Sequence, residues 1–177
     1  TKDYSEATRY YMNKSSLPKV IGGFNTNVSY KNFDMSILMN FSFGSYLYDS
    51  VYASLMNGFE SPGRNGHPNL KNRWQNPGDK TDVPLFLNEQ NDFNATSSRF
   101  LFKNNYLRVR GLNLGYTFDE NWMENYQIQG LRVYLQGDNI FTFQSHKGID
   151  PEQALSGLTN NRSHQMRTIS LGVNLQL

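Results

Sequence analysis

Apolar and polar residues alternate one by one over a long segment in the first quarter of the chain. From Phe33 to Phe43 every odd position carries a large apolar side chain, and the even positions are small or polar except Leu38. Successive side chains of a β-strand point to opposite faces, so the pattern predicts a strand between two unlike environments. Soluble strands usually run about 5–6 residues, whereas a tilted membrane-spanning strand needs about 9–11. This strand is long enough to cross a membrane.

Four further segments alternate in the same way. The predicted strands cover residues about 19–30, 33–48, 104–118, 130–143 and 166–177. Only Lys31 and Asn32 separate the first two strands, which predicts a β-hairpin, because asparagine tolerates left-handed backbone. Within 104–118 the apolar positions change from odd to even. A bulge near Arg110 and Gly111 would restore a single apolar face.

The connections between these strands are alternately short and long. The long ones are predicted to cover about 49–103 and 144–165. Outer-membrane barrels have short periplasmic turns and long extracellular loops in this order, and a five-stranded sheet leaves two edges that lipid does not tolerate. We therefore expect the chain to be part of a larger barrel. The first long loop opens with a predicted short helix, with Asp49 as N-cap and with Val51, Leu55 and Phe59 on one face.

The composition agrees with a strand-built membrane protein. Apolar residues make up 37% and aromatic residues 14%, and the mean hydropathy is −0.65. This aromatic content argues against disorder, and the absence of a run of 18 apolar residues excludes a transmembrane helix. The chain has no cysteine, which excludes disulfides, cysteine zinc sites and cysteine nucleophiles. A formal charge of +2 gives no reason to expect a nucleic-acid partner.

Several motifs in a fixed order resemble one family. They are RWQNPGDKTDVP at 73–84, NYLRVRGLNLGYTF at 105–118, LRVYLQGDNIFTF at 131–143, KGIDPE at 147–152 and RTISLGVNLQL at 167–177. In this order they resemble the carboxy-terminal end of the SusC/RagA family of TonB-dependent outer-membrane transporters of Bacteroidetes. The final residue departs from the family pattern, because members normally end in an aromatic residue and this chain ends in Leu177.

The resemblance implies a fold, a location and a function. It implies an all-β fold: the last five antiparallel strands of a transmembrane barrel of about 22 strands, with the plug domain outside this chain. It places the protein in the bacterial outer membrane, where it would import glycan or peptide oligomers with a SusD-like surface lipoprotein. Further partners would be TonB, reached through the missing N-terminal part, the remaining barrel and plug segments, and the lipid bilayer.

Other functions remain open at this stage. A SusC-like barrel that acts as a structural or assembly scaffold is one alternative, and a soluble β-sandwich binding module is a less favoured one. We expect no enzymatic activity, no cofactor and no metal site. The histidines His67, His146 and His164 lack metal-binding spacing, and the acids at 150 and 152 lack the spacing of a calcium loop. The Asp-Pro-Glu motif at 150–152 is therefore predicted to be loop architecture.

Three residues are candidates for substrate binding. Trp74 and Phe59 lie in the first long loop, where an aromatic ring can stack on a sugar. Asn40 lies on the predicted lumen face, where an amide donates and accepts hydrogen bonds without carrying charge. Acids and bases are balanced in the 49–103 loop, so the expected ligand is neutral.

Overall fold

The computed structural model describes residues 4–57, 63, 65–86, 95–119, 121, 128–152, 156–159 and 163–177. The chain forms two compact units. The first, which we call the loop unit, comprises Thr1–Leu17, Tyr46–Phe102 and Gln153–Arg162. The second, the sheet unit, comprises Pro18–Ser45, Lys103–Glu152 and Ser163–Leu177.

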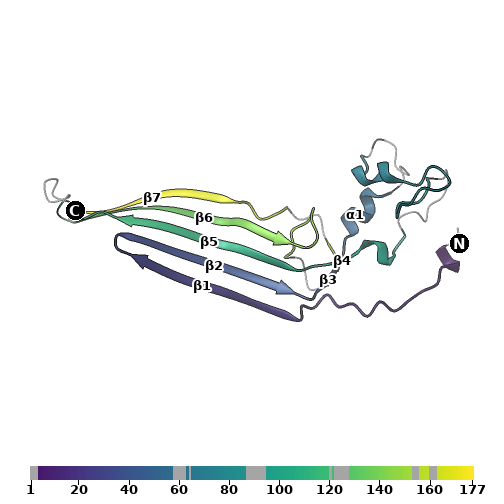
Figure 1. Cartoon of the computed structure of the whole chain (residues 1–177), viewed down its shortest axis with the longest axis horizontal. Helices are drawn as coiled ribbons and strands as arrows, with labels where there is room; N and C mark the ends of the chain where they lie inside the picture. Colours follow the sequence, from purple (N-terminus) through teal and green to yellow (C-terminus); the bar gives the residue numbers. More distant parts are fainter. Residues whose placement is uncertain are drawn as a thin grey trace. The chain divides into compact units, whose positions relative to one another are not determined.

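The sheet unit contains five long antiparallel strands. They are β1 (Val20–Tyr30), β2 (Phe33–Phe43), β5 (Tyr106–Thr117), β6 (Gly130–Gln144) and β7 (Thr168–Gln176). The strand order in the sheet is β1-β2-β5-β6-β7, so that each strand pairs with its neighbours in sequence among these five (Figure 1). The prediction of long antiparallel strands from alternation is confirmed.

A two-residue turn joins β1 to β2, as predicted. Tyr30 pairs directly with Phe33, and the residue with left-handed backbone is Lys31, with φ of 53°. The expectation that asparagine would take this conformation is wrong. The side chain of Asn32 instead binds the end of β5. Its amide nitrogen donates to the carbonyl oxygen of Thr117 at 2.9 Å and to Asp119 Oδ1 at 2.8 Å. These bonds fix the turn to the end of β5.

The predicted bulge is present at Arg110. Between β2 and β5 the register moves from Met39 opposite Val109 to Leu38 opposite Gly111, so Arg110 has no direct partner. A second irregularity lies opposite, between β5 and β6, where Asn139 has φ of 52°. The bulge brings the odd apolar residues before it and the even ones after it to the same face.

The strand expected over 33–48 is divided in the structure. β2 ends at Phe43, Gly44 has φ of 85°, and a separate short strand β3 (Tyr46–Tyr48) follows. Glycine takes this left-handed backbone without steric cost. The alternation also stops here, because Ser45 occupies the next position expected to be apolar. β3 pairs with β4 (Leu101–Lys103), a short strand that lies immediately before β5.

The loop unit has a small core of its own. Its described residues form α1 (Ser50–Leu55) and the 3-10 helices η1 (Tyr4–Glu6), η2 (Pro68–Asn72) and η3 (Ser98–Phe100). Its buried apolar side chains include Ala53, Met56, Leu70, Val83 and Phe100. No helix among the described residues is long and apolar enough to span a membrane.

The helix predicted in this unit is present at the expected position, but other residues than expected form its buried face. Asp49 caps α1, because its carboxylate accepts a hydrogen bond from the Tyr52 N–H at 2.8 Å, as expected. The core-facing residues are Ala53 and Met56, whereas Leu55 is 38% exposed. Phe59, expected on the helical face, lies outside the described residues. The prediction assumed a helix that reaches Phe59, but α1 ends at Leu55.

Candidate functional site

One face of the sheet is apolar across all five strands. The cross-strand register aligns Val28, Met35, Leu114, Leu135 and Leu171 in one transverse row. Several of these side chains are exposed, among them Leu171 at 74%. Water-soluble proteins rarely expose contiguous apolar patches of this extent. The face therefore matches an apolar environment rather than water.

Aromatic residues mark both ends of this apolar face. At the turn end Phe33 pairs with Tyr116, and their ring centroids are 4.7 Å apart. At the other end Phe41 and Phe43 lie 5.5 Å apart. The ten residue steps from Phe33 to Phe43 span about 33 Å along the strand, or about 23–27 Å at the tilt of about 35–45° seen in membrane barrels. The apolar band of an outer-membrane barrel is about 25 Å tall, so the two aromatic ends have the spacing of interfacial girdles.

The opposite face of the sheet carries hydrogen-bonding groups. A second transverse row, displaced by one residue from the apolar one, consists of Asn27, Ser36, Asn113, Gln136 and Ser170. Each of these side chains donates and accepts hydrogen bonds without carrying a charge. The Oδ1 atom of Asn113 is buried and has no hydrogen-bond partner. This row has the chemistry of a wall that faces water or a neutral polar ligand.

A buried ion pair lies on the polar face toward the end opposite the hairpin turn. The Arg108 side chain on β5 is 3% exposed and that of Asp150, in the segment after β6, is 7% exposed. Arg108 Nη2 donates to both carboxylate oxygens of Asp150, at 3.0 and 2.9 Å. The Nε atom of Arg108 donates to Thr142 Oγ1 at 3.1 Å. A guanidinium buried this deeply is stable only with such pairing.

Glu152 extends the ion pair into a network. Its carboxylate accepts from Arg108 Nη1 at 3.0 Å and from Arg110 Nη2 at 2.7 Å. It also accepts from Asn40 Nδ2 at 2.8 Å and from Gln165 Nε2 at 3.0 Å. We call Asn40, Arg108, Arg110, Asp150, Glu152 and Gln165 the charge cluster. It joins β2, β5 and both ends of the connection between β6 and β7.

The charge cluster keeps Asp150 ionised. Burial alone would raise the pKa of this carboxyl group. The backbone N–H groups of Glu152 and Gln165, at 2.9 and 3.1 Å, and the guanidinium of Arg108 outweigh burial and hold the pKa below its ordinary value of 3.8. The arrangement contains no nucleophile with an adjacent base. Its chemistry is that of charge-paired loop anchoring, and the prediction that the Asp-Pro-Glu motif is loop architecture is confirmed.

A second ion pair lies near the turn end of the same face. Arg132 on β6 donates to both carboxylate oxygens of Asp34 on β2, through Nε at 2.9 Å and Nη2 at 2.6 Å. The pair reaches across β5 at Gly115, where a Cβ atom would clash with Arg132 and Asp34. The two side chains are 27% and 37% exposed, so water solvates this pair much more than the charge cluster.

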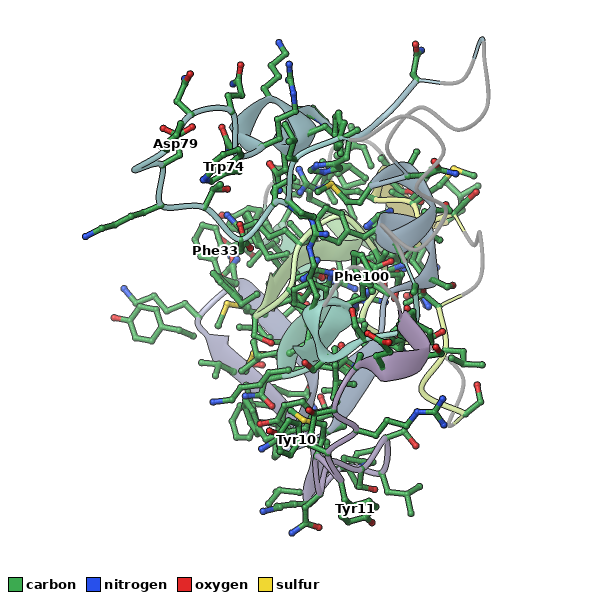
Figure 2. All side chains as sticks on the ribbon, turned by 90° about the vertical axis from the view of Figure 1, so that its right-hand side faces the viewer. Tyr10, Tyr11, Phe33, Trp74, Asp79 and Phe100 are labelled. Atoms are coloured by element: carbon green, nitrogen blue, oxygen red, sulfur yellow. The ribbon has the colours of Figure 1, made fainter. Side chains whose placement is uncertain are left out.

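The loop unit offers a different kind of surface, on the segment that contains Trp74. The backbone N–H of Trp74 donates to the carbonyl oxygen of Val83 at 2.8 Å. Trp74 and Asp79 both lie on this loop (Figure 2). The backbone N–H groups of Asn76 and Gln75 donate to the carboxylate of Asp79 and lower its pKa below 3.8. An open groove of about 880 Å³ is lined by Lys71, Asn72, Arg73, Gln75, Asp79, Lys80, Thr81 and Asp82.

The three predicted binding residues fall in different parts of the chain. Asn40 belongs to the sheet unit and to the charge cluster, and Trp74 belongs to the loop unit. Phe59 lies outside the described residues. The ring of His67 accepts a hydrogen bond from the Asn69 N–H at 3.1 Å and packs edge-on against Tyr52. Among the described residues, no group of three or more His, Asp or Glu side chains has a metal-binding arrangement.

The charge cluster was not predicted from the sequence. Arg108 and Arg110 occupy non-apolar positions of a predicted strand, and Asp150 and Glu152 lie two positions apart in a predicted loop. The sequence did contain a signal for the cluster. Two bases lie two positions apart in a predicted strand, and two acids lie two positions apart in a loop. Period-two alternation shows the face of a strand on which a residue lies but not which loop folds over that face.

Known proteins with similar sequences are TonB-dependent receptors. No family model matches the chain. The chain is similar to the TonB-dependent receptor SusC of Bacteroides thetaiotaomicron, with 32% identity over 94% of this chain. It is also similar to the TonB-dependent receptor P3 of Formosa agariphila, with 28% identity over 90% of this chain. In both cases the match covers 16% of the relative, so the chain spans about a sixth of the length of these curated relatives.

Solved structures agree with the sequence relatives. The RagAB peptide importer in its closed-closed state matches 96% of this chain with a TM-score of 0.78 and 24% identity. The structure of the RagAB peptide transporter matches 96% of the chain with a TM-score of 0.77 and 25% identity. Each match covers 19% of the solved chain, so the five strands are part of a larger barrel. The chain is therefore a β-barrel segment of the SusC/RagA family of TonB-dependent receptors.

Proposed function

We propose that this chain forms part of the wall of an outer-membrane importer that takes up glycan or peptide oligomers together with a SusD-like surface lipoprotein. The observation that carries the proposal is the contrast between the two sheet faces. The same five strands have a predominantly apolar face and an opposite face with a full row of neutral hydrogen-bonding side chains. A wall between lipid and a wet lumen requires this combination.

The uncharged row favours neutral cargo over ions. Amide and hydroxyl groups exchange hydrogen bonds with the backbone of a peptide or with sugar hydroxyls, and they do not bind either sign of charge tightly. The similarity to a peptide importer supports peptide oligomers as one cargo class. TonB would supply the energy through parts of the receptor other than these five strands. This segment itself would perform no covalent chemistry.

Uptake by cells tests the proposal directly. Cells that carry the full-length receptor should accumulate fluorescently labelled neutral oligopeptides or oligosaccharides, and deletion of its gene should abolish accumulation of at least one of the two classes. Loss of TonB should have the same effect. Unchanged uptake of both classes after deletion, with other outer-membrane proteins lost from the membrane, would instead support a scaffold function.

Protease accessibility tests the proposed orientation. We place the turn at Lys31 in the periplasm and the connections 49–103 and 144–165 at the cell surface. Trypsin added to intact cells should cut within these connections and should leave the bond after Lys31 intact, because the turn lies behind the membrane. Mass spectrometry of the fragments locates the cuts. Cleavage after Lys31 in intact cells, but none in the two connections, would invert the topology.

Trp74 is proposed as a ligand-stacking residue, together with Phe59 and Asn40 as further ligand contacts. Trp74→Ala should weaken capture of a neutral oligomer about 5–150-fold, since stacking on an aromatic ring is typically worth about 1–3 kcal/mol. Affinity should change little between low and high salt, because charge attraction is not the source of binding. Titration calorimetry with the full-length receptor measures both quantities.

The matched control for this experiment is Tyr11→Ala, which removes an aromatic side chain that is 93% exposed in the same unit. It should bind the oligomer like the unmodified receptor. Equal affinities for Trp74→Ala and the unmodified receptor would remove Trp74 from the site. A steep salt dependence would contradict the neutral-ligand proposal.

A further inference from the structure

One charged side chain on the long strands of the sheet unit stands outside the ion pairs. These five strands carry five charged residues, which are Asp34, Arg108, Arg110, Arg132 and Asp138. The first four take part in the ion pairs described above. Asp138 takes part in no ion pair among the described residues. Its carboxylate oxygens lie 3.4 Å from Nε2 of Gln136, its neighbour on the polar face, which is longer than an ordinary N–H···O hydrogen bond of about 2.7–3.2 Å.

Asp138 lies at the middle depth of the wall. The register places it opposite Gly111 on β5, and Gly111 opposite Leu38 on β2. Leu38 is midway between the aromatic ends of β2 at Phe33 and Phe43. An ionisable side chain at the depth of the hydrocarbon is costly to retain, and such groups typically mark a functional site with a partner of opposite charge. The missing partner of Asp138 is therefore a cation.

The space beside Asp138 on β5 is open among the described residues. Gly111 has no side chain, and a Cβ atom placed on it would have only the Cβ atom of Leu38 within 4 Å, at 3.8 Å. Gly115, which also lies on the polar face of β5, differs, because a Cβ atom there would clash with the ion pair that crosses it. Arg110, the residue next to Gly111, donates to the charge cluster and not to Asp138. The wall therefore leaves room for a ligand group over Gly111.

The two side chains that flank Gly111 suit two parts of one ligand. Asp138 offers a carboxylate, and Leu38, which is 49% exposed, offers apolar surface. Neighbouring strands lie about 4.8 Å apart, so β2 and β6, on either side of β5, are separated by about 10 Å. The first residue of a peptide fits this interval, with its ammonium group toward the carboxylate and its side chain toward the leucine. An oligosaccharide of neutral sugars has no cation to offer.

We propose that Asp138 binds the free amino-terminal ammonium group of an oligopeptide and that the first side chain of this peptide packs on Leu38. The inference rests on the proposed import function and deepens it, because it selects peptides over glycans. The terminal ammonium group is the cation that an unblocked peptide carries even when all its side chains are neutral, which agrees with the uncharged row beside Asp138. A single ion pair at close range adds no long-range attraction that salt would screen.

The test measures binding of two peptide pools to the purified full-length receptor in detergent by equilibrium dialysis. Both pools consist of octapeptides without acidic or basic side chains and with an amidated carboxyl terminus, and only one pool is acetylated at its amino terminus. The unmodified receptor should bind the free-amine pool about 10–100-fold more tightly, the ratio expected for a hydrogen bond between charged groups. Asp138→Asn should lower the affinity for the free-amine pool to that for the acetylated pool and should leave the latter unchanged.

Asp34→Asn is the matched control, because it removes a carboxylate of the same face that an arginine already binds. It should keep the preference for the free-amine pool. Equal binding of both pools by the unmodified receptor, or an unchanged preference in Asp138→Asn, would overturn the inference and leave peptide import standing. Binding of a pool of neutral oligosaccharides, but of neither peptide pool, would overturn it and leave glycan import standing. Binding of no oligomer would contradict the proposed function as well.

Discussion

Ile37→Arg should strongly impair assembly of the barrel, whereas Asn27→Arg should be tolerated. Ile37 lies on the apolar face, about midway between the aromatic ends of β2 at Phe33 and Phe43. An arginine at the middle of the lipid-facing wall of a barrel costs about 2–4 kcal/mol. Asn27 lies at nearly the same depth, since it pairs with Ser36, but its side chain is exposed on the polar face.

The folded fraction of each full-length variant can be measured by its heat-modifiable migration on a gel after refolding into lipid vesicles. We expect the Ile37→Arg receptor to refold poorly and the Asn27→Arg receptor to refold like the unmodified protein. Equal damage in both variants would contradict the assignment of the two faces. Undisturbed refolding of Ile37→Arg would show that this face does not contact lipid.

Arg108→Met should destabilise the folded receptor by about 3–5 kcal/mol at pH 7, the usual loss when one member of a buried ion pair is removed. The variant leaves the carboxylate of Asp150, whose side chain is only 7% exposed, without its guanidinium. Arg132→Met is the control. It removes an arginine from a pair whose acid, Asp34, is 37% exposed, so its loss should be at most about 1 kcal/mol. Urea unfolding in lipid vesicles measures both losses.

The loss caused by Arg108→Met should shrink in acid. The pKa of Asp150 is lowered in the folded protein, so its ionisation stabilises the fold above its ordinary pKa of 3.8, and this stabilisation is lost as the pH falls through the lowered value. As the pH falls through the lowered value, the carboxyl group in the folded protein becomes neutral, and a neutral group needs its arginine less. A difference in stability that stays constant from pH 7 to pH 3 would mean that Asp150 does not respond to Arg108.

The strands could be predicted from sequence because each of them separates two unlike environments. Lipid on one side and water on the other impose the alternation along each strand, so the five strands are visible in the sequence. The bulge at Arg110 is visible too, as a change in the phase of the alternation. The phase change locates the extra residue because a one-residue shift would otherwise turn every later side chain to the wrong face. Few features of a soluble sheet are determined as strongly.

The loops and the charge cluster could not be predicted in the same way. The predicted strand extends past Gly44, where the backbone breaks, although the alternation stops there at Ser45. Alternation also does not identify Ala53 and Met56 as the buried face of α1. It places Asn40 on the polar face, where it looks like an ordinary lumen residue, but the structure shows it bound to Glu152. That contact joins residues 112 positions apart, and it depends on a loop conformation that no local pattern records.

The short strands β3 and β4 have a consequence for how such receptors diversify. They bring the two ends of the 46–102 insertion together, with the Asp49 N–H donating to the Phe100 carbonyl oxygen and the Asn104 N–H donating to that of Ser45, both at 2.9 Å. An insertion whose ends meet and whose core is its own can be exchanged without changing the strands that carry it. A receptor built in this way can replace this one segment while its membrane wall stays the same. Chimeras that join at Ser45 and Asn104 are therefore the natural starting point for exchanging this segment between receptors.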